Sequence, residues 1–185
     1  MLADDTTELG GEIGMLKNRW SCHNNHIFAE GYSSVEVFAC HAMLTEALVW
    51  SMVPCMAPWD IAYNKCYDVV RYGWKLIALV RRRILRFAHC GTPCQSQTLA
   101  RAPALRSIEE PLGKRNLKPH QQKLVACGNA LSCFTVWLCI ELMNAFSYFV
   151  IENPDQSYLW IAPLILELYA LKGVGFIGFV MRAYG

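Results

Sequence analysis

A turn that carries a cysteine directly follows an apolar run near the middle of the chain. Residues 84–90 are typical of a buried strand, and Gly91-Thr92-Pro93-Cys94 then ends the run with a glycine and a proline. In open α/β sheets, ligands bind at the carboxyl ends of the strands. We therefore expect Cys94 to lie on a loop at a sheet edge, where a reacting group would be placed.

A second strand-like run ends in a similar way further along the chain. Phe149-Val150-Ile151 is a short strand-like run that leads into Glu152-Asn153-Pro154, which we expect at the same edge. A buried structural cysteine and a surface Glu-Asn-Pro turn would explain each tripeptide alone. Their order and their shared position after a strand favour a paired site.

The two motifs together resemble a known family. Strand-Pro-Cys-Gln followed by strand-Glu-Asn-Pro is similar to the catalytic motifs of the DNA cytosine-5 methyltransferases, which read Pro-Cys-Gln and Glu-Asn-Val. The resemblance covers roughly residues 35–185. It implies that the Cys94 thiolate adds to C6 of cytosine, that Glu152 assists as an acid at N3, and that S-adenosylmethionine supplies the methyl group. It also implies DNA as the partner, with the base flipped out of a duplex.

The expected fold is α/β, a doubly wound Rossmann-like sheet that is mostly parallel, with helices on both faces. Strands are expected at residues 35–39, 53–56, 84–90, 147–151 and 174–180. Helices are expected at 43–50, 69–80 with Asp68 as a cap, 121–144 and 159–171. Residues 1–33 show no sustained period, so we expect a loosely ordered leader before a methyltransferase-like domain at 34–185.

The cofactor site is expected after the first strand. The family carries Phe-x-Gly-x-Gly there, whereas this chain reads Phe38-Ala39-Cys40-His41-Ala42, so larger residues fill both glycine positions and we expect weak cofactor binding. Asp60 is the candidate for the ribose hydroxyls and Trp59 for the adenine, although a capping Asp after a core Trp is equally consistent. The candidate cofactor-binding residues are Phe38, Cys40, Ala42, Trp59, Asp60 and Pro93.

A basic insert follows Cys94. Between Arg101 and Lys123 there are six basic residues against two acidic ones, a balance that suits contact with phosphates but also suits a solvated loop. The candidate substrate-binding residues are Gln95, Ser96, Arg101, Arg106, Asn153 and Pro154.

Composition bears on the core, the partners and the cellular location of the protein. With 54% hydrophobic residues the chain has ample material for a core, and a net charge of +2 is too small to require nucleic acid. Nine cysteines without a CxxC pair indicate neither a zinc site nor a disulfide framework, so we expect no metal and a reducing, intracellular location, cytoplasmic, nuclear or virus-encoded. The acidic start lacks the pattern of a signal peptide.

Two alternatives stay open beside an active methyltransferase. The first is a catalytically inactive nucleic-acid-binding or structural relative of the same fold. The second is a small membrane protein with two spans in 124–181, which Gly128 and Glu141 argue against by interrupting the first apolar run. The family's target-recognition region is not found before Gly185, so a separate target-recognition chain is a candidate partner.

Overall fold

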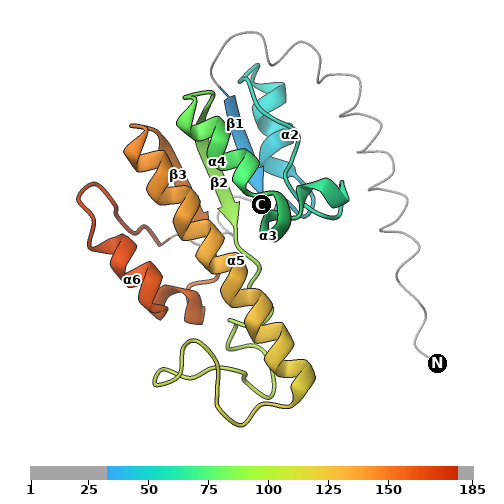
Figure 1. Ribbon diagram of the computed structural model, residues 1–185, viewed down its shortest axis with the longest axis vertical. Coiled ribbons are helices and arrows are strands. Elements are labelled where there is room, and N and C mark those ends of the chain that lie inside the picture. The colour runs from blue at the N-terminus through green and yellow to red at the C-terminus, as the bar shows by residue number, and fades with distance from the viewer. Residues whose placement is uncertain (1–32, 179–185) are drawn as a thin grey trace, which may run out of the picture. The chain divides into compact units, whose positions relative to one another are not determined.

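The computed structural model describes residues 33–178 (Figure 1). These residues divide into two compact units. Within this range, the first unit contains residues 33–92 and 137–152, and the second contains 93–136 and 153–178. The long helix α5 (Pro119–Asn144) contributes residues to both units. The predicted leader, except for its last residue, lies outside the described residues.

A three-stranded parallel sheet forms the centre of the first unit. Its strands are β1 (Ser33–Val37), β2 (Leu85–Gly91) and β3 (Tyr148–Glu152), with β2 between the other two. The register pairs Val37 with Cys90 and Gly91 with Glu152. An α/β fold with a parallel sheet is confirmed, and three of the predicted strands are present within two residues of their predicted bounds.

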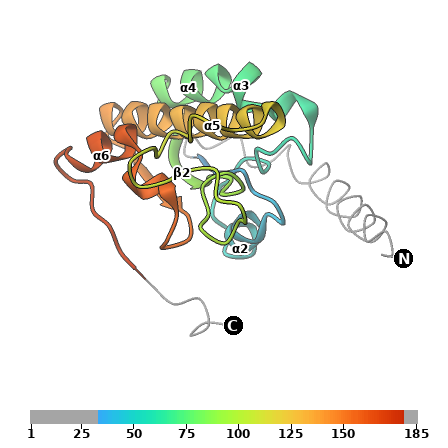
Figure 2. The same cartoon turned by 90° about the horizontal axis from the view of Figure 1, so that it is seen from below.

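Helices cover both faces of this sheet. Figure 2 shows α2 (Met43–Trp50) on one side of β2 and α4 (Trp74–Arg81) on the other. Between these helices lie a short 3-10 helix, η2 (Lys65–Tyr67), and α3 (Val69–Tyr72), which Asp68 caps as predicted by accepting from the Val70 and Arg71 N–H groups. The core of this unit consists mainly of Val35, Val37, Leu76, Ile77, Val80, Leu85, Ala88, Cys90, Leu138, Cys139 and Leu142.

The strand predicted at 53–56 is wrong as a regular element. The segment does run beside β1, because the Ser34 N–H donates to the Pro54 carbonyl at 3.1 Å and isolated bridges form at Cys55 and Trp59. Pro54 and Pro58 have no N–H to donate, so a continuous hydrogen-bond ladder cannot form. The edge of the sheet is therefore lined by bridges in place of a fourth strand.

The strand predicted at 174–180 is also wrong over 174–178, and its last two residues lie outside the described range. Gly175 and Gly178 weaken a strand because they bring no side chain to pack. Ile177 is 84% exposed. Phe176 lies edge-on to Trp160 at 5.5 Å between ring centroids and so packs on its own unit.

The second unit is built on the first part of α5. It adds a 3-10 helix, η3 (Tyr158–Ile161), and α6 (Pro163–Tyr169). The single helix predicted at 159–171 is interrupted at Ala162, which is extended because the residue before a proline avoids helical angles, and Pro163 then begins α6. The core of this unit includes Leu105, Val125, Phe134, Val136, Leu159, Ile165 and Leu168.

Of the helices in residues 33–178, α5 alone is long and apolar enough to cross a membrane. Its most apolar stretch is 44% buried inside the protein, and core helices of soluble proteins meet the same criteria of length and hydropathy. Ser132, Thr135, Leu138 and Leu142 lie on its buried side, at the spacing of a helix that packs along one face. By itself this helix does not favour the membrane alternative.

Candidate functional site

The ends of three strands converge on Gly91 in the first unit. A Cβ atom built on Gly91 would lie 3.3 Å from the Phe38 carbonyl oxygen and 3.8 Å from Glu152 Oε2. The Glu152 carboxylate is therefore held beside the carboxyl end of β2, and the turn after β1 lies close on the other side. Glu152 is exposed.

The turn after β1 has an unusual backbone. Phe38, Cys40 and Ala42 have φ angles of 59°, 44° and 54°, in the left-handed region that favours glycine. Cys40 and Ala42 are the positions at which the resembling family carries glycine. The turn therefore keeps a glycine-type conformation while it bears side chains.

Asp60 and Tyr63 hold this turn in place. Asp60 Oδ2 accepts from the Cys40 N–H at 3.2 Å, and its Oδ1 accepts from the Ala62 N–H at 2.8 Å. The Tyr63 hydroxyl donates to the Cys40 carbonyl at 2.9 Å, and the Tyr63 ring packs in a buried cluster with Ala42. Burial, with the nearby Asp60 charge adding to it, raises the pKa of Tyr63 to about 12 and keeps the hydroxyl a donor.

Trp59, the candidate for adenine contact, is a core side chain. It is 6% exposed and stacks on Tyr67, with ring centroids 4.7 Å apart. Its indole Nε1–H has no hydrogen-bond partner among the described residues. The burial agrees with the alternative of a core tryptophan, whereas the unpaired N–H is a feature that a ligand acceptor could satisfy.

Sequence reasoning missed Glu36, which supports the same turn. Glu36 is 7% exposed, and its Oε2 accepts from the Thr45 N–H at 2.7 Å and from the Thr45 hydroxyl at 2.6 Å. Ala42 gives α2 no side-chain cap, so Glu36 satisfies an N–H of the first helical turn from the neighbouring strand. An acid inside the apolar run Val35-Glu36-Val37 was the signal that could have revealed it.

Cys94 lies in the second unit, at the start of a single helical turn. The Cys94 carbonyl accepts from the N–H groups of Gln97 at 2.7 Å and Thr98 at 2.9 Å. The thiol is free and half-buried, Pro93 is half-buried and Gln95 is exposed. The sequence prediction of a thiol on a loop directly after a strand is confirmed.

Arg106 joins the Cys94 loop to α5. Arg106 is 1% exposed, and its Nε donates to the Ser96 carbonyl at 2.8 Å. Its Nη2 donates to Ser96 Oγ and the Val125 carbonyl, and its Nη1 donates to the Pro111 carbonyl and Asn129 Oδ1. Burial lowers the pKa of Arg106 to about 10. All five guanidinium N–H groups are engaged by protein oxygens, so a phosphate contact, as predicted for Arg106, would require this loop to open.

The turn after Glu152 is tied to η3. The Pro154 carbonyl accepts from the Trp160 indole N–H at 2.8 Å, and Asn153 is half-buried. Arg101, on the insert, is half-buried. These three predicted substrate-binding residues lie in the second unit.

The predicted residues thus gather in two groups. Phe38, Cys40, Ala42, Trp59, Asp60 and Glu152 belong to the first unit, and Pro93, Cys94, Gln95, Ser96, Arg101, Arg106, Asn153 and Pro154 belong to the second. The meeting of Cys94 with Glu152 involves both units and stays a prediction. Within residues 33–178, no three His, Cys, Asp or Glu side chains are placed to hold a metal ion.

Comparisons with protein families, with characterised proteins and with solved structures find no match to this chain.

Proposed function

We propose that this protein has a doubly wound, Rossmann-like methyltransferase fold and uses S-adenosylmethionine to methylate C5 of cytosine in DNA. The pairing of Gly91 with Glu152 carries this proposal, since it holds a carboxyl group beside the end of the strand that leads into Pro93-Cys94. A free thiol three residues beyond Gly91, in the order Pro-Cys-Gln, supplies the nucleophile that the chemistry needs.

In the proposed reaction the Cys94 thiolate forms a bond to C6 of a flipped cytosine. The C5–C6 π electrons then become available at C5, and Glu152 assists by donating a proton at N3. When bound, S-adenosylmethionine supplies the methyl group that C5 takes up. Loss of the C5 proton to a base then re-forms the C5–C6 double bond and expels Cys94 as a thiolate, while N3 returns its proton to Glu152. A reducing, intracellular location belongs to this proposal, because the thiol must stay free.

The fit of the cofactor to the turn after β1 is partial. The left-handed angles of Cys40 and Ala42 suit a loop whose backbone approaches a cofactor closely. The Cys40 and Ala42 side chains take up part of the space between this backbone and a cofactor. Asp60, the ribose candidate, already accepts hydrogen bonds from two backbone N–H groups. We therefore expect weak binding of S-adenosylmethionine.

A catalytically inactive nucleic-acid-binding relative is the second candidate. One observation favours it: Tyr63 packs with Ala42 and bonds to Cys40, so the protein's own side chain occupies part of the region where the cofactor is expected. The two candidates differ in whether a covalent bond forms to the base.

Covalent capture tests the chemistry. DNA that contains 5-fluorocytosine should form a stable adduct in the presence of S-adenosylmethionine. The C5 position then carries fluorine in place of the proton that a base must remove, so elimination of the Cys94 thiolate is blocked. Cys94→Ser should abolish the adduct, and Glu152→Gln should slow its formation by about 10²–10⁴-fold. Cys133→Ser, which changes another free and exposed thiol, is the matched control and should behave as wild type. Absence of an adduct despite measured binding of cofactor and DNA would select the inactive relative.

A further inference from the structure

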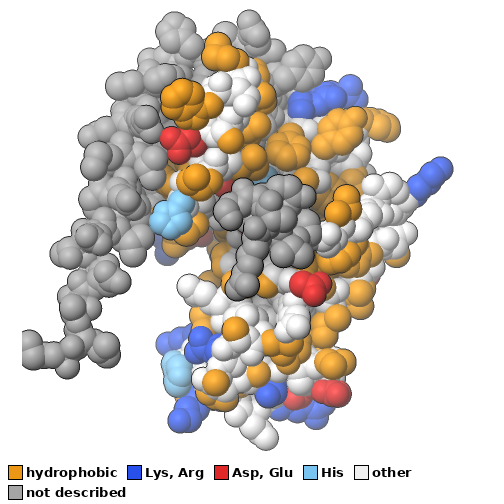
Figure 3. All heavy atoms as spheres, turned by 180° about the vertical axis from the view of Figure 1, so that it is seen from behind, with side chains coloured by type: hydrophobic (Ala, Val, Ile, Leu, Met, Phe, Trp, Pro, Cys, Tyr) orange, Lys and Arg blue, Asp and Glu red, His pale blue; other side chains and the backbone are white. Residues whose placement is uncertain are grey.

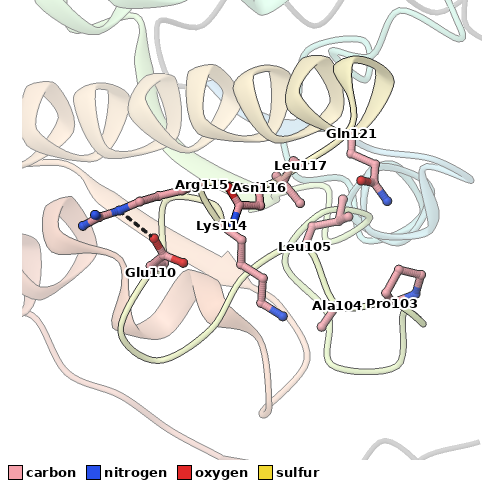
Figure 4. Close-up of a pocket in the computed structure, with 9 residues that line it drawn as sticks. All are labelled: Pro103, Ala104, Leu105, Glu110, Lys114, Arg115, Asn116, Leu117 and Gln121. Atoms are coloured by element: carbon pink, nitrogen blue, oxygen red, sulfur yellow. Dashed lines mark ion pairs between the residues drawn. The ribbon is translucent and has the colours of Figure 1, made fainter.

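A hollow lies within the basic insert of the second unit. Its volume is about 500 Å³, within the usual range for ligand pockets of about 300–1,000 Å³. Figure 4 shows it between the segment that carries Pro103 and Leu105 and the segment that carries Lys114, with Gln121 from the start of α5 nearby. Every lining residue comes from residues 103–121, so one stretch of chain forms the whole site.

The walls of this hollow are preformed. The Lys114 N–H donates to the Leu105 carbonyl at 3.0 Å and joins the two segments. Gly113, with φ of 123°, turns the chain so closely against α5 that a Cβ there would lie 2.5 Å from Val125 Cγ1. Because these contacts are made within the protein itself, binding would not have to order the insert first.

The charges that line the hollow favour a singly charged anion. Arg115 Nε lies 3.1 Å from Glu110 Oε1, so these two charges compensate each other. Among the lining residues Lys114 then carries the remaining positive charge, and in Figure 4 its side chain extends between Glu110 and Ala104. Outside the lining, the Glu109 carboxylate lies within its electrostatic reach, since the Lys114 charge contributes to lowering the pKa of Glu109. A phosphodiester group carries one negative charge. Figure 3 shows Lys and Arg side chains together with Asp or Glu side chains at the lower end of the view, where the insert lies.

The remaining lining suits a base. Pro103, Ala104 and Leu117 provide apolar surface, Leu105 is almost fully buried, and Asn116 and Gln121 provide side-chain amides. The Gln121 Oε1 already accepts from the Lys118 N–H at 2.9 Å, so its amide NH₂ is the part left to donate to a base edge.

We propose that this hollow binds one unpaired nucleotide of the nucleic-acid strand, an inference that rests on the function proposed above. The base lies against Leu117 and Pro103, and its phosphodiester lies near Lys114. In an intact duplex the bases are stacked and paired, so the site selects single-stranded or opened DNA. This site is separate from the one at Cys94 and would hold a nucleotide that is not methylated.

Fluorescence anisotropy with a labelled single-stranded 12-mer, the same sequence as a closed hairpin, and an abasic single strand tests this inference. The single strand should bind more tightly than the hairpin and the abasic strand. Lys114→Gln should lower the slope of log affinity against log salt by about 0.7, the value for one phosphate contact on a single strand. Lys172→Gln, an exposed lysine outside the hollow, is the matched control and should leave the slope unchanged.

A second readout locates the base. A single strand with 4-thiothymidine should cross-link to the peptide that contains residues 103–121, and Leu117→Asn should reduce this cross-link while sparing the salt slope. The assignment would be overturned if Lys114→Gln and Lys172→Gln gave equal slopes of log affinity against log salt. It would also be overturned if cross-links formed only outside residues 103–121. Cys94→Ser should bind the 12-mer as wild type does. If no adduct forms with 5-fluorocytosine DNA but Lys114→Gln still lowers the salt slope, only the proposed function is contradicted. If the adduct forms but Lys114→Gln leaves the salt slope unchanged, only this site is contradicted.

Discussion

Gly128 and Ser96 approach so closely that α5 has no room for a side chain at position 128. A Cβ on Gly128 would lie 2.2 Å from Ser96 Oγ and 3.5 Å from Ser96 Cβ. Ser96 lies two residues after Cys94, and its Oγ accepts from Arg106 Nη2 at 2.9 Å. A glycine in the middle of a long helix is therefore what lets the Cys94 loop pack against α5.

Gly128→Ala should destabilise the protein although alanine is the better helix former. The helix preference alone would stabilise by about 1 kcal/mol, but the clash with Ser96 Oγ should cost about 1–3 kcal/mol. Ser96→Ala removes the clashing oxygen but also its bond to Arg106, so the comparison is made in that background: there Gly128→Ala should cost about 1 kcal/mol less in denaturant unfolding than it does in wild type. Gly175→Ala, where a Cβ meets nothing within 4 Å, is the control. An equal cost of Gly128→Ala in wild type and in the Ser96→Ala background would contradict the clash.

Arg106→Lys should lower the free energy of unfolding by about 2–4 kcal/mol. Lysine keeps the charge but replaces five forked N–H groups with three donors at one point, so buried acceptors such as the Ser96 carbonyl lose their partners. Chemical denaturation measures the loss. Arg115→Lys, at a surface ion pair with Glu110, should change stability by less than about 0.5 kcal/mol. Equal effects at the two positions would show that the Arg106 network is not a stability determinant.

Cys40→Gly should stabilise the protein by about 1 kcal/mol, because glycine adopts a φ of 44° without the strain that a side chain brings. Ala42→Gly should be nearly neutral, since the same relief is offset by the loss of a buried methyl group beside Tyr63. The double variant should bind S-adenosylmethionine more tightly in calorimetry. Ala47→Gly, in the ordinary helical backbone of α2, should instead cost about 1 kcal/mol and leave cofactor binding unchanged.

Glu36→Ala should destabilise the protein by about 1–2 kcal/mol, because α2 then loses the acceptor for the Thr45 N–H. Thermal or denaturant unfolding would show this loss. Glu167→Ala, at an exposed position on α6, should stay within about 0.5 kcal/mol of wild type. A similar small effect at Glu36 would mean that water can replace its cap.

Stability should fall as the pH rises from 9 to 11. Burial, with the Glu36 charge adding to it, raises the pKa of Cys55 from 9.0 to about 11 in the folded protein. The folded state therefore disfavours the thiolate, and this contribution to stability is complete below pH 9 and is lost as the pH rises through 11. Cys55→Ala should flatten the pH dependence of unfolding in this window. An unchanged slope would assign the alkaline loss to other groups, such as Tyr63.

The local elements of this protein could be predicted because each depends on residues close together in the chain. The apolar run before Gly91 predicted β2, the long apolar stretch before residue 144 predicted α5, and Asp68 predicted its own cap. The loop position of Cys94 followed from a glycine and a proline next to it. Such signals are complete within a short window of sequence.

The elements that the sequence did not predict depend on partners far along the chain. Arg106 looked like a phosphate ligand because a basic residue in a polar insert is usually solvated, yet here it is buried against Ser96 and Asn129. Glu36 finds Thr45, and Gly128 finds Ser96, only once separate segments pack together. A side chain's own chemistry determines which bonds it can form, but tertiary packing decides which oxygen it reaches and whether water is excluded there.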